Sequence, residues 1–481
     1  MKFHAIASLF LITTLSAISS PILGEETTSA TAPSSRAHTG ADISKVIGNT
    51  TKPAASDISQ QFPYGITAKT PPYLTKINEE GTPSYHRHRI QLRVFQGCPH
   101  IEISSGGRLW ATWFGSNVQA ERAPNHDDQF SIISTSGDGG KTWKEVFVFD
   151  PSHQLGATAS DPLLWKDAQG RIRFVCLRNL FVNDKELGDK TAWEFIMLDP
   201  ENPYTEWSEP RLIGNKNMSI MKPLLMPDGT ILRPMDDFKF VGHPTEPRIR
   251  FLNEKPDGTV NFVSEQADPD AVFAEQSPIV RKDGSLFSTY RAKEGQKFME
   301  SFDGGRTWKQ GGYHPMQFSI NTKSVLARLD SGRLLLVGND VQMRDAQEGE
   351  NESNTKGKNK GKSKVFFYTN EKGEEVILEK GQARMRMTAF LSEDDGKTFK
   401  HRLLLNAEDT SYPSVTIGED GMIYIAYDHG RGAIGKHIIY LTKITEEDIL
   451  AGKLVNKDSA LNLIISKPSD HGGGRRVGDD I

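Results

Sequence analysis

Short runs of strand-forming residues, each introduced by a glycine, recur along the chain. The glycines that lead them are Gly107, Gly170, Gly229, Gly284, Gly332 and Gly421. Glycine readily adopts the positive φ that a tight hairpin needs, so each run is expected to leave a turn as a β-strand. The first five recur at intervals of roughly 50 to 60 residues, which suits four-stranded antiparallel units. The pattern predicts an all-β protein of six units, and a seventh with a degenerate turn is the alternative.

The interval before the last glycine is longer, and its composition explains why. The stretch over 345–364 reads DAQEGENESNTKGKNKGKSK, in which Ala346 is the one apolar residue. Such a segment cannot bury a core. It is predicted to be a solvated insertion loop.

A second repeat is a turn motif, Ser-x-Asp-x-Gly-x-Thr-aromatic. It occurs three times, over Ser136–Trp143, Ser301–Trp308 and Ser392–Phe399. The Asp side chain suits bonds to neighbouring backbone amides, and the Thr-aromatic pair suits the start of a strand. The motif resembles the Asp-box of the sialidase (neuraminidase) superfamily, in which these boxes are structural turns on the outside of a β-propeller. The resemblance implies a six-bladed, sialidase-like β-propeller with BNR repeats and covers the chain from about Arg89 to Leu450.

The N-terminus indicates export. Lys2 precedes the apolar run Ala5–Ile18 and then small residues, which is the order of a secretory signal peptide. We therefore predict a signal peptide over 1–24, a flexible linker over 25–74, the propeller over 75–468 and a disordered tail over 469–481. The protein is expected to be secreted or periplasmic, and a buried N-terminal helix is the alternative.

Charge and cysteine content limit the classes of partner and cofactor that the protein is expected to bind. The formal net charge of −4 leaves no basic footprint for nucleic acid, and no run outside the N-terminus is long enough for a membrane span. Cys98 and Cys176 are either a disulfide or two buried thiols. No Cys/His cluster has zinc spacing and no Gly-rich loop is suited to phosphate, so neither metal nor cofactor is expected. The expected partner is a glycan, and the protein is expected to be a monomer.

Candidate chemistry first appears around the fourth hairpin. Glu275 opens one strand and Arg291 closes the next, so both emerge at the same end of the antiparallel pair. From these residues alone, a weak salt bridge at the rim is the alternative. The resemblance implies that Arg291 grips a substrate carboxylate.

A second arginine precedes the third Asp-box. The resemblance places a carboxylate-binding Arg at the start of this strand, where Arg384 stands in the run Arg384–Leu391. Arg386 has the same parity, is expected on the same face, and is the rival. A guanidinium binds a carboxylate bidentately, which suits it to this role.

The candidate nucleophile is Tyr412. The resemblance implies a catalytic tyrosine at the start of this strand, here followed by Pro413. A phenol has a pKa near 10 and needs a base such as Glu275. Sialidases use a tyrosine where other glycosidases use a carboxylate. An ordinary core tyrosine is the alternative.

The general acid is expected between the first two strands and the first Asp-box. Asp127 and Asp128 are adjacent there, and pairing of two carboxylates raises the pKa of one. The spacing does not choose between them.

One departure from the family concerns the substrate clamp. Sialidases carry Arg-Ile-Pro on the first strand, whereas this chain has Gly97-Cys98-Pro99, with glycine in place of the arginine. Arg93 and Arg122 are the candidate replacements. The chain looks like the branch of secreted sialidase-like proteins that lacks this motif.

The expected function is therefore a sialidase-type exo-glycoside hydrolase that releases a terminal acidic sugar. The first alternative is a neutral-sugar hydrolase or polysaccharide lyase that relies on a histidine, namely His100, His126 or His153. The second is a glycan-binding propeller without catalysis, because one fold hosts many functions.

Overall fold

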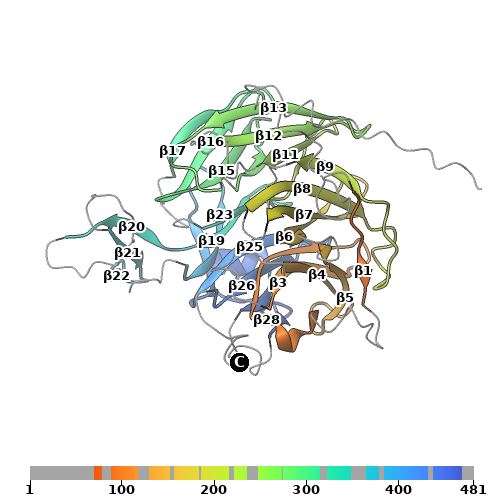
Figure 1. Ribbon diagram of the computed structural model, residues 1–481. Coiled ribbons are helices and arrows are strands. Elements are labelled where there is room, and N and C mark those ends of the chain that lie inside the picture. The colour runs from red at the N-terminus through yellow and green to blue at the C-terminus, as the bar shows by residue number, and fades with distance from the viewer. Residues whose placement is uncertain are drawn as a thin grey trace, which may run out of the picture. The chain divides into compact units, whose positions relative to one another are not determined.

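The computed structural model describes residues 70–77, 88–117, 129–151, 157–183, 186–215, 221–235, 248–273, 275–314, 322–347, 364–378, 384–431 and 437–468 (Figure 1). All of them belong to one compact unit, Gly40–Ile481. The predicted signal peptide and tail lie outside the described residues, as does most of the predicted insertion loop. The described part is almost entirely β-structure, with the short helix α2 (Glu446–Ala451) and the 3-10 turn η3 (Ile90–Leu92).

Six antiparallel sheets follow one another along the chain, as the hairpin pattern predicted. The first three sheets contain β1 (Thr75–Lys76), β2 (Phe95–Ile103), β3 (Leu109–Ser116), β4 (Gln129–Ser136) and β5 (Lys144–Phe149); β6 (Ala157–Lys166), β7 (Ile172–Asn183), β8 (Glu186–Ile196) and β9 (Arg211–Asn215); and β10 (Leu224–Leu225), β11 (Ile231–Met235), β12 (Arg248–Glu254) and β13 (Val260–Ala267). The last three contain β14 (Ser277–Val280), β15 (Leu286–Ala292), β16 (Gly295–Ser301) and β17 (Lys309–Tyr313); β18 (Val325–Arg328), β19 (Leu334–Asn339), β23 (Met387–Ser392) and β24 (His401–Asn406); and β25 (Thr410–Ile417), β26 (Ile423–His429), β27 (Ile438–Ile444) and β28 (Ala460–Ser466). Within each sheet, successive strands pair as neighbours, except that β1 adds to the outer edge of the first.

A glycine hairpin joins the first two strands of every one of these sheets. Positive φ values occur at Gly107 (89°), Gly170 (76°), Gly229 (81°), Gly284 (84°), Gly332 (81°) and Gly421 (78°). An L-residue at these positions would be strained, which explains the recurring glycine.

The insertion lies between the second and third strands of the fifth sheet. Its flanks form a small separate sheet of β20 (Gln342–Asp345), β21 (Lys364–Thr369) and β22 (Glu375–Ile377) (Figure 1). A satellite core packs beneath it, built from Val341, Phe366 and Leu378. The hydrophilic composition of the loop did not predict these flanking strands.

Apolar clusters fill every interface between consecutive sheets. Buried residues of the first sheet pack on the second, and the same holds for each following pair. A further cluster, with Ile101 and Trp113 on one side and Ala426 and Leu441 on the other, joins the sixth sheet to the first. The sheets therefore close into a ring, which is the arrangement of blades in a β-propeller.

The ring closes without a shared strand between its ends. Among the described strands, β2 of the first sheet packs against β25 and β26 of the sixth without pairing with either. Gln96 Nε2 donates to the His437 carbonyl at 3.1 Å, and the Ile101 amide donates to Ser414 Oγ at 3.3 Å. Closure therefore rests on packing and side-chain bonds.

The three Asp-boxes connect the third and fourth strands of the first, fourth and fifth sheets. In the second box, Asp303 Oδ1 accepts from Ser301 Oγ at 2.9 Å and from the Thr307 amide at 2.9 Å. Thr307 Oγ1 donates to Asp303 Oδ2 at 2.7 Å, and Trp308 Nε1 donates to the Gly305 carbonyl at 3.0 Å. The Ser–Asp and Thr–Asp bonds recur in the other two boxes. The motif is thus a closed turn whose polar groups bond to one another.

The two ends of each sheet differ in what they carry. In the fourth sheet, Leu286 pairs with Ser301 of the Asp-box, whereas Arg291 pairs with Gln296 at the far end of the same ladder. The glycine hairpins and Asp-boxes therefore lie at one end, and the candidate site residues lie at the other.

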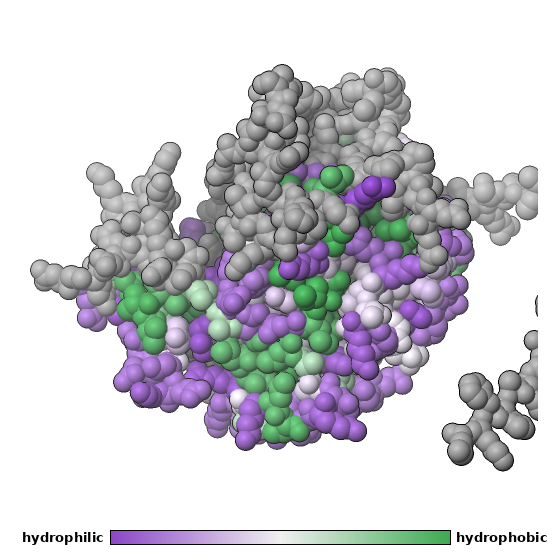
Figure 2. All heavy atoms as spheres, turned by 90° about the horizontal axis from the view of Figure 1, so that it is seen from below, coloured by the Kyte–Doolittle hydropathy of each residue, from purple (hydrophilic) through white to green (hydrophobic). Residues whose placement is uncertain are grey.

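The described surface mixes apolar and polar residues. Figure 2 shows one face, where a band of apolar residues lies between hydrophilic ones. Exposed large apolar side chains come from many elements, among them Leu92, Leu225, Phe302, Ile377 and Ile464. Such scattered exposure is normal for a soluble protein and needs no ligand to explain it.

Candidate active site

Glu275 and Arg291 meet at the end of the fourth sheet. Ser277 pairs with Thr289, so the residues two positions further on face each other. Arg291 Nη1 lies 3.1 Å from Glu275 Oε1, and each residue is only 4% exposed. The pair is therefore buried and is not the rim salt bridge that the sequence left open.

Tyr412 joins this pair from the first strand of the sixth sheet. The same nitrogen, Arg291 Nη1, donates to the Tyr412 hydroxyl at 3.2 Å. Since Arg has no acceptor, the phenol oxygen accepts this bond and retains its own hydrogen to donate elsewhere. Burial raises the pKa of the Tyr412 phenol, and the Arg291 charge opposes that rise. The phenol is thus neutral at neutral pH and needs a base before it can act as a nucleophile.

Arg384 and Arg386 point to different neighbours. Arg384 Cζ lies 5.4 Å from the centroid of the Tyr412 ring. Arg386 Cζ lies 4.0 Å from the ring of Tyr368, on the small sheet of the insertion. The expectation that both share one face is wrong, because both residues precede β23 and Arg386 has a φ of 58°, so strand alternation does not apply to them.

The Arg384 guanidinium carries no counter-charge of its own. Among the described residues it forms neither an ion pair nor a side-chain hydrogen bond, and it is only partly buried. A cation left uncompensated beside a buried phenol favours an anionic ligand at this position.

Strained backbone marks the first strands of four sheets at this end. Glu275, Tyr412, Cys98 and Asp161 have φ values of 44°, 55°, 53° and 47°. Non-glycine residues in this region cost of order 1–3 kcal/mol each and cluster at functional sites. Cys98, Asp161 and Tyr412 also sit at β-bulges, which re-aim side chains.

The sequence interpretation missed Asp161. A signal was available, because Cys98, Asp161 and Tyr412 each precede a proline on the first strand of a sheet. Asp161 also raises the pKa of the Cys98 thiol, although burial is the larger cause. It is therefore a further carboxylate near this end of the first two sheets.

Lys323 adds another cation, from the segment before β18. Burial lowers the pKa of Lys323 to about 8, against the opposing charge of Glu275. Its Nζ lies 3.1 Å from His100 Nε2, while Ser414 Oγ lies 3.3 Å from His100 Nδ1. Since His100 is 1% exposed and held between these two groups, it fits a positioning role better than a substrate contact.

The structure also places one of the two candidate replacements for the missing arginine. Arg93 is buried with both terminal nitrogens 2.6 Å from the Glu145 carboxylate, at the outer strands of the first sheet. It does not reach Tyr412. Several other sequence predictions lie outside the described residues: Arg122, His126, Asp127, Asp128 and His153.

Arg431 is a site residue that the sequence did not reveal. Its Cζ lies 4.3 Å from the centroid of the Tyr412 ring, closer than that of Arg384. It lies two residues after β26. Only the fold brings it to Tyr412.

The two cysteines are free. Cys98 and Cys176 are both buried and unbonded to each other, so the disulfide alternative is wrong. Burial raises the pKa of Cys98 to about 12, which leaves it a poor nucleophile at neutral pH. Within the described ranges, no group of three or more His, Cys, Asp or Glu side chains is placed to hold a metal ion. Nor does any helix in that part of the chain have the length and apolarity to cross a membrane.

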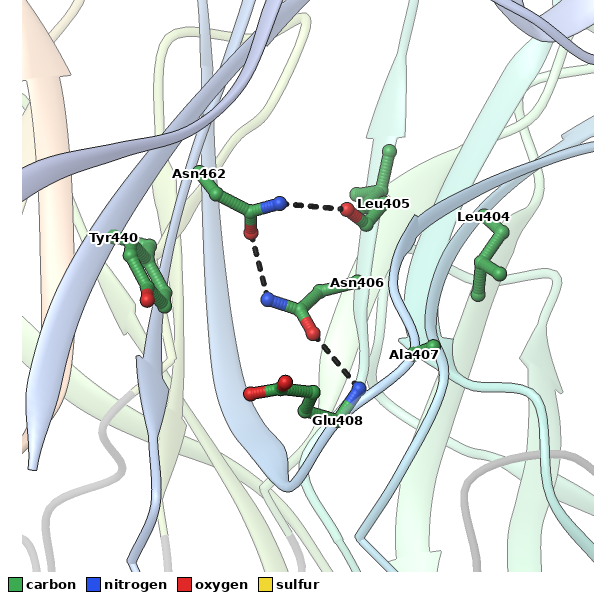
Figure 3. Close-up of a pocket in the computed structure, with 7 residues that line it drawn as sticks. All are labelled: Leu404, Leu405, Asn406, Ala407, Glu408, Tyr440 and Asn462. Atoms are coloured by element: carbon green, nitrogen blue, oxygen red, sulfur yellow. Dashed lines mark hydrogen bonds between the residues drawn. The ribbon is translucent and has the colours of Figure 1, made fainter. Parts of the chain in front are cut away.

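A separate pocket lies between the outer strands of the fifth and sixth sheets. It has a volume of about 320 Å³, and Figure 3 shows Asn406 and Asn462 bonded across it. Leu404, Glu408 and Tyr440 complete much of its lining. It shares no residue with the cluster around Tyr412.

Three solved structures resemble the chain at low sequence identity. NanB sialidase from Streptococcus pneumoniae is 11% identical, with a TM-score of 0.49, over 75% of this chain and 70% of that one. A protein of unknown function from Dyadobacter fermentans is 14% identical, with a TM-score of 0.48, over 70% and 91%. A puromycin-hydrolyzing peptidase from Mycobacterium tuberculosis is 10% identical, with a TM-score of 0.36, over 79% and 54%. These likenesses concern the fold alone.

The family is shown by sequence. Among curated proteins, none matches the chain. The model of the BNR repeat-like domain matches residues 107–425, which is more than half of the chain. This range runs from the first glycine hairpin to the sixth sheet and contains all three Asp-boxes. The chain therefore belongs to the BNR repeat-like domain family, and its ring of six antiparallel sheets is the sialidase-like β-propeller predicted from the sequence.

Proposed function

We propose that the protein is a retaining exo-glycoside hydrolase of sialidase type that releases a terminal sugar bearing a carboxylate. The observation that carries this proposal is the bifurcated contact of Arg291 Nη1, with Glu275 Oε1 at 3.1 Å and the Tyr412 hydroxyl at 3.2 Å. It puts the proposed nucleophile Tyr412 and the proposed base Glu275 on the same nitrogen of Arg291. The uncompensated guanidinium of Arg384 beside the same phenol supports an anionic substrate.

In the proposed reaction, Tyr412 is the nucleophile. Glu275 accepts the phenol proton while the Tyr412 oxygen bonds to the anomeric carbon and the bond to the leaving oxygen breaks. The leaving oxygen takes its proton from an acid, for which Asp127 and Asp128 are the candidates by resemblance. Water then attacks the anomeric carbon and gives a proton to the acid, now a carboxylate, while the bond to the Tyr412 oxygen breaks. The released tyrosine recovers its proton from Glu275, and the sugar leaves with retained configuration.

The surroundings of Tyr412 suit a neutral nucleophile. A carboxylate in its place would repel an anionic substrate, whereas a phenol does not. The pKa of Tyr412 is raised by burial, so the phenol stays neutral until Glu275 removes its proton. Arg291 is well placed to stabilise the phenolate as it forms, because it already donates to that oxygen.

The location of the protein outside the cytoplasm and its monomeric state are predicted from the sequence and are part of the proposal. A secreted or periplasmic protein with a predicted signal peptide would meet oligosaccharides and glycoconjugates outside the cytoplasm. A monomer with a single site suits removal of one terminal residue at a time.

The test is product analysis on paired substrates. The purified protein is incubated with a panel of terminal sialosides and acidic oligosaccharides, and with analogues whose carboxylate is reduced to an alcohol. We expect a free reducing sugar from the acid and much slower release from the alcohol, with only weak activity on common sialosides. The Arg291→Ala variant should lose the preference for the acid.

Other products would assign the site differently. An unsaturated uronate that absorbs in the ultraviolet would identify a lyase. Equal rates on acid and alcohol would show that no carboxylate is recognised and would favour a neutral-sugar hydrolase. Saturable binding without turnover would make the protein a glycan-binding propeller.

A further inference from the structure

Gly97 leaves room for a side chain that comes from elsewhere. A Cβ at position 97 would lie 2.8 Å from Arg431 Nη2, 3.0 Å from Asp428 Oδ2 and 3.0 Å from Phe95 Cζ. Gly97 does not have a positive φ, so the need for glycine here is spatial and not conformational. The guanidinium of Arg431 fills the space that a residue on the first strand would otherwise occupy.

Arg431 is held in this place from both ends of the chain. Its Nη2 donates to Asp428 Oδ2 at 2.7 Å and lies 3.1 Å from Cys98 Sγ. Asp428 is in turn fixed, because Oδ2 also accepts from the Cys98 amide at 3.0 Å and Oδ1 accepts from Ser411 Oγ at 2.6 Å. The first and sixth sheets together therefore set the position of the guanidinium.

One end of the guanidinium, Nη1, is left for a ligand, since Nη2 is bonded to the protein and Nε is fully buried. Among the described residues, neither Nε nor Nη1 of Arg431 has a hydrogen-bond partner. The group is 12% exposed and its Cζ stands over the Tyr412 ring at 4.3 Å. Donors that are buried, charged and unpaired are costly unless something binds them.

The charges around Tyr412 do not balance. Among the described residues, Arg291, Arg384 and Arg431 surround the phenol, whereas the carboxylates near it are Glu275, Asp428 and Asp161. Lys323 adds a further cation, which interacts electrostatically with Glu275 and Asp428. An anionic ligand would restore neutrality.

We propose that Arg431 is a carboxylate-binding residue of the site and acts in place of the arginine that the first strand lacks. The inference deepens the proposed function and rests on it for the substrate class, a sugar acid. Its Nη1 would bind the carboxylate from the side of the sixth sheet, and Arg291 would bind it from the fourth. Arg431 would thus replace the arginine that sialidases carry on the first strand, and residue 97 would need to be glycine to leave room for the Arg431 side chain.

The experiment measures binding separately from turnover. Wild type, Arg431→Ala and Arg431→Lys are titrated calorimetrically with two free sugar acids, N-acetylneuraminic acid and glucuronic acid, and with their carboxylate-reduced forms. Hydrolysis of the matching glycosides is measured in parallel. Arg333→Ala is the matched control, because it removes one positive charge at the hairpin end of the fifth sheet.

We expect Arg431→Ala to weaken binding of the acid by about 10- to 100-fold, the loss of one charge-assisted contact. Binding of the reduced form and the melting temperature should hardly change, and Arg333→Ala should resemble wild type. Gly97→Arg should also lose affinity, because the new side chain displaces Arg431. The double variant Gly97→Arg/Arg431→Ala should recover part of it.

The outcomes separate this inference from the proposed function. Acid binding that depends on Arg431 without hydrolysis of any glycoside would support the inference and remove the hydrolase. Hydrolysis that is unaffected in Arg431→Ala would keep the hydrolase and overturn the inference. Equal losses for acid and reduced ligand, in step with a lower melting temperature, would show that Arg431 is purely structural. Absence of both binding and turnover in the wild type would remove both.

Discussion

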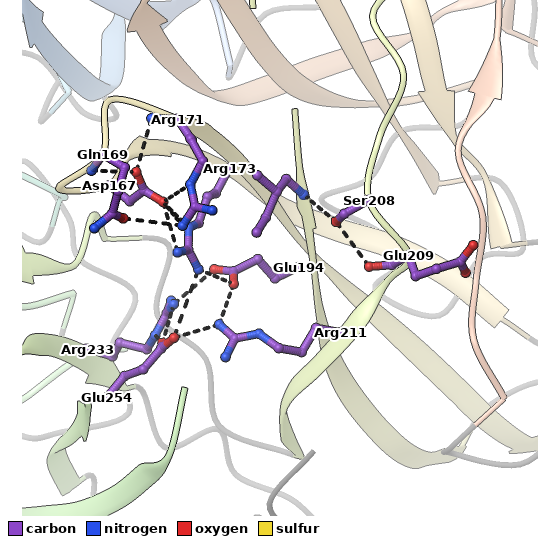
Figure 4. Close-up of polar contacts among 11 residues, drawn as sticks. Asp167, Gln169, Arg171, Arg173, Glu194, Ser208, Glu209, Arg211, Arg233 and Glu254 are labelled. Atoms are coloured by element: carbon purple, nitrogen blue, oxygen red, sulfur yellow. Dashed lines mark hydrogen bonds and ion pairs between the residues drawn. The ribbon is translucent and has the colours of Figure 1, made fainter. Parts of the chain in front are cut away.

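Two buried clusters of arginine and carboxylate side chains show how similar chemistry serves different ends. One lies between the second and third sheets and is shown in Figure 4; we call it the interblade network. Its members are the buried residues Asp167, Arg173, Glu194, Arg233 and Glu254 and the half-buried Arg211. The other surrounds Tyr412 at the end of the ring.

In the interblade network the charges balance. Glu194 is bonded by Arg173 at 2.9 Å, by Arg211 at 2.5 Å and by Arg233 at 2.9 Å. Burial opposes the charge of Glu194, but these arginines lower its pKa to about 2. Arg173 and Arg233 also each place Cζ 5.0 Å from the ring of Trp165. Every ion faces an opposite ion or an aromatic ring within regular strands.

Around Tyr412 the same residue types are left unbalanced and strained. Arg384 has no counter-ion among the described residues, and the Arg431 fork is only partly used. Glu275 and Tyr412 have positive φ. The comparison teaches that burial of charge alone does not point to a binding site; an excess of one sign on strained backbone is the feature on which the proposal of a site rests.

The largest expected effect concerns the chemistry of the site. Tyr412→Phe should lower kcat/KM by about 10³-fold or more, because the nucleophile is removed, while the melting temperature hardly moves. Tyr427→Phe is the matched control, since this buried tyrosine bonds to Thr442 and Asn462 instead. It should cost about 1 kcal/mol of stability and leave turnover intact. Full activity of Tyr412→Phe would end its assignment as nucleophile.

The next effect separates the two clusters directly. Glu194→Ala should lower the free energy of unfolding by about 3–5 kcal/mol, because it leaves buried arginines uncompensated. Glu275→Gln keeps an amide oxygen that Arg291 can bond, so it should cost less stability than Glu194→Ala, whereas activity should fall by about 10²-fold or more. Chemical denaturation and steady-state kinetics on both variants check this, and a similar pattern in the two would erase the distinction.

The same carboxylate predicts a dependence on pH. The pKa of Glu194 in the folded protein, about 2, lies below its ordinary value of 4.5. Its contribution to stability is therefore fully present above about pH 4.5 and is lost as the pH falls toward 2. Denaturant titrations of the wild type should show this loss, and Glu194→Gln should show less of it. A wild-type curve as flat as that of the variant would contradict the assignment.

A smaller effect is expected at the uncompensated cation. Arg384→Ala should weaken binding of an acidic sugar by about 10- to 100-fold without destabilising the fold, because no protein partner is lost. Arg386→Ala is the control, since that side chain stacks on Tyr368 instead. Calorimetric titration of both variants measures the difference. If Arg386→Ala had the larger effect on binding, Arg386 would be the residue that contacts the ligand.

The smallest effect belongs to the Asp-boxes. Asp303→Ala removes the acceptor of the Ser301 and Thr307 bonds and should cost about 1–2 kcal/mol of stability, with kinetics unchanged. Asp330→Ala, an exposed turn aspartate of the fifth sheet, is the control. Any change in substrate affinity for Asp303→Ala would argue that the boxes influence the site.

Much of the fold followed from short-range patterns in the sequence. Six glycines, each followed by strand-forming residues, predicted six hairpins, because positive φ is a local property of the backbone. The Asp-boxes were equally predictable, since every bond within them joins residues four or fewer positions apart. The pairing of Glu275 with Arg291 could also be predicted, because only one hairpin separates the two residues.

The rest of the site depended on distant contacts. Strand parity predicted one face for Arg384 and Arg386, but both residues lie before β23, where Arg386 has a positive φ. In the sequence, Gly97 indicated the loss of a substrate-binding arginine. In the structure, the Arg431 guanidinium occupies the space next to Gly97. Arg431 and Cys98 are 333 positions apart and meet only because the sixth sheet packs against the first. The sequence by itself thus determined the turns, the repeat and the hairpin that carries Glu275 and Arg291, because these depend on backbone chemistry within a few residues. Only the tertiary structure decided which cations surround Tyr412, because that depends on how the ring closes.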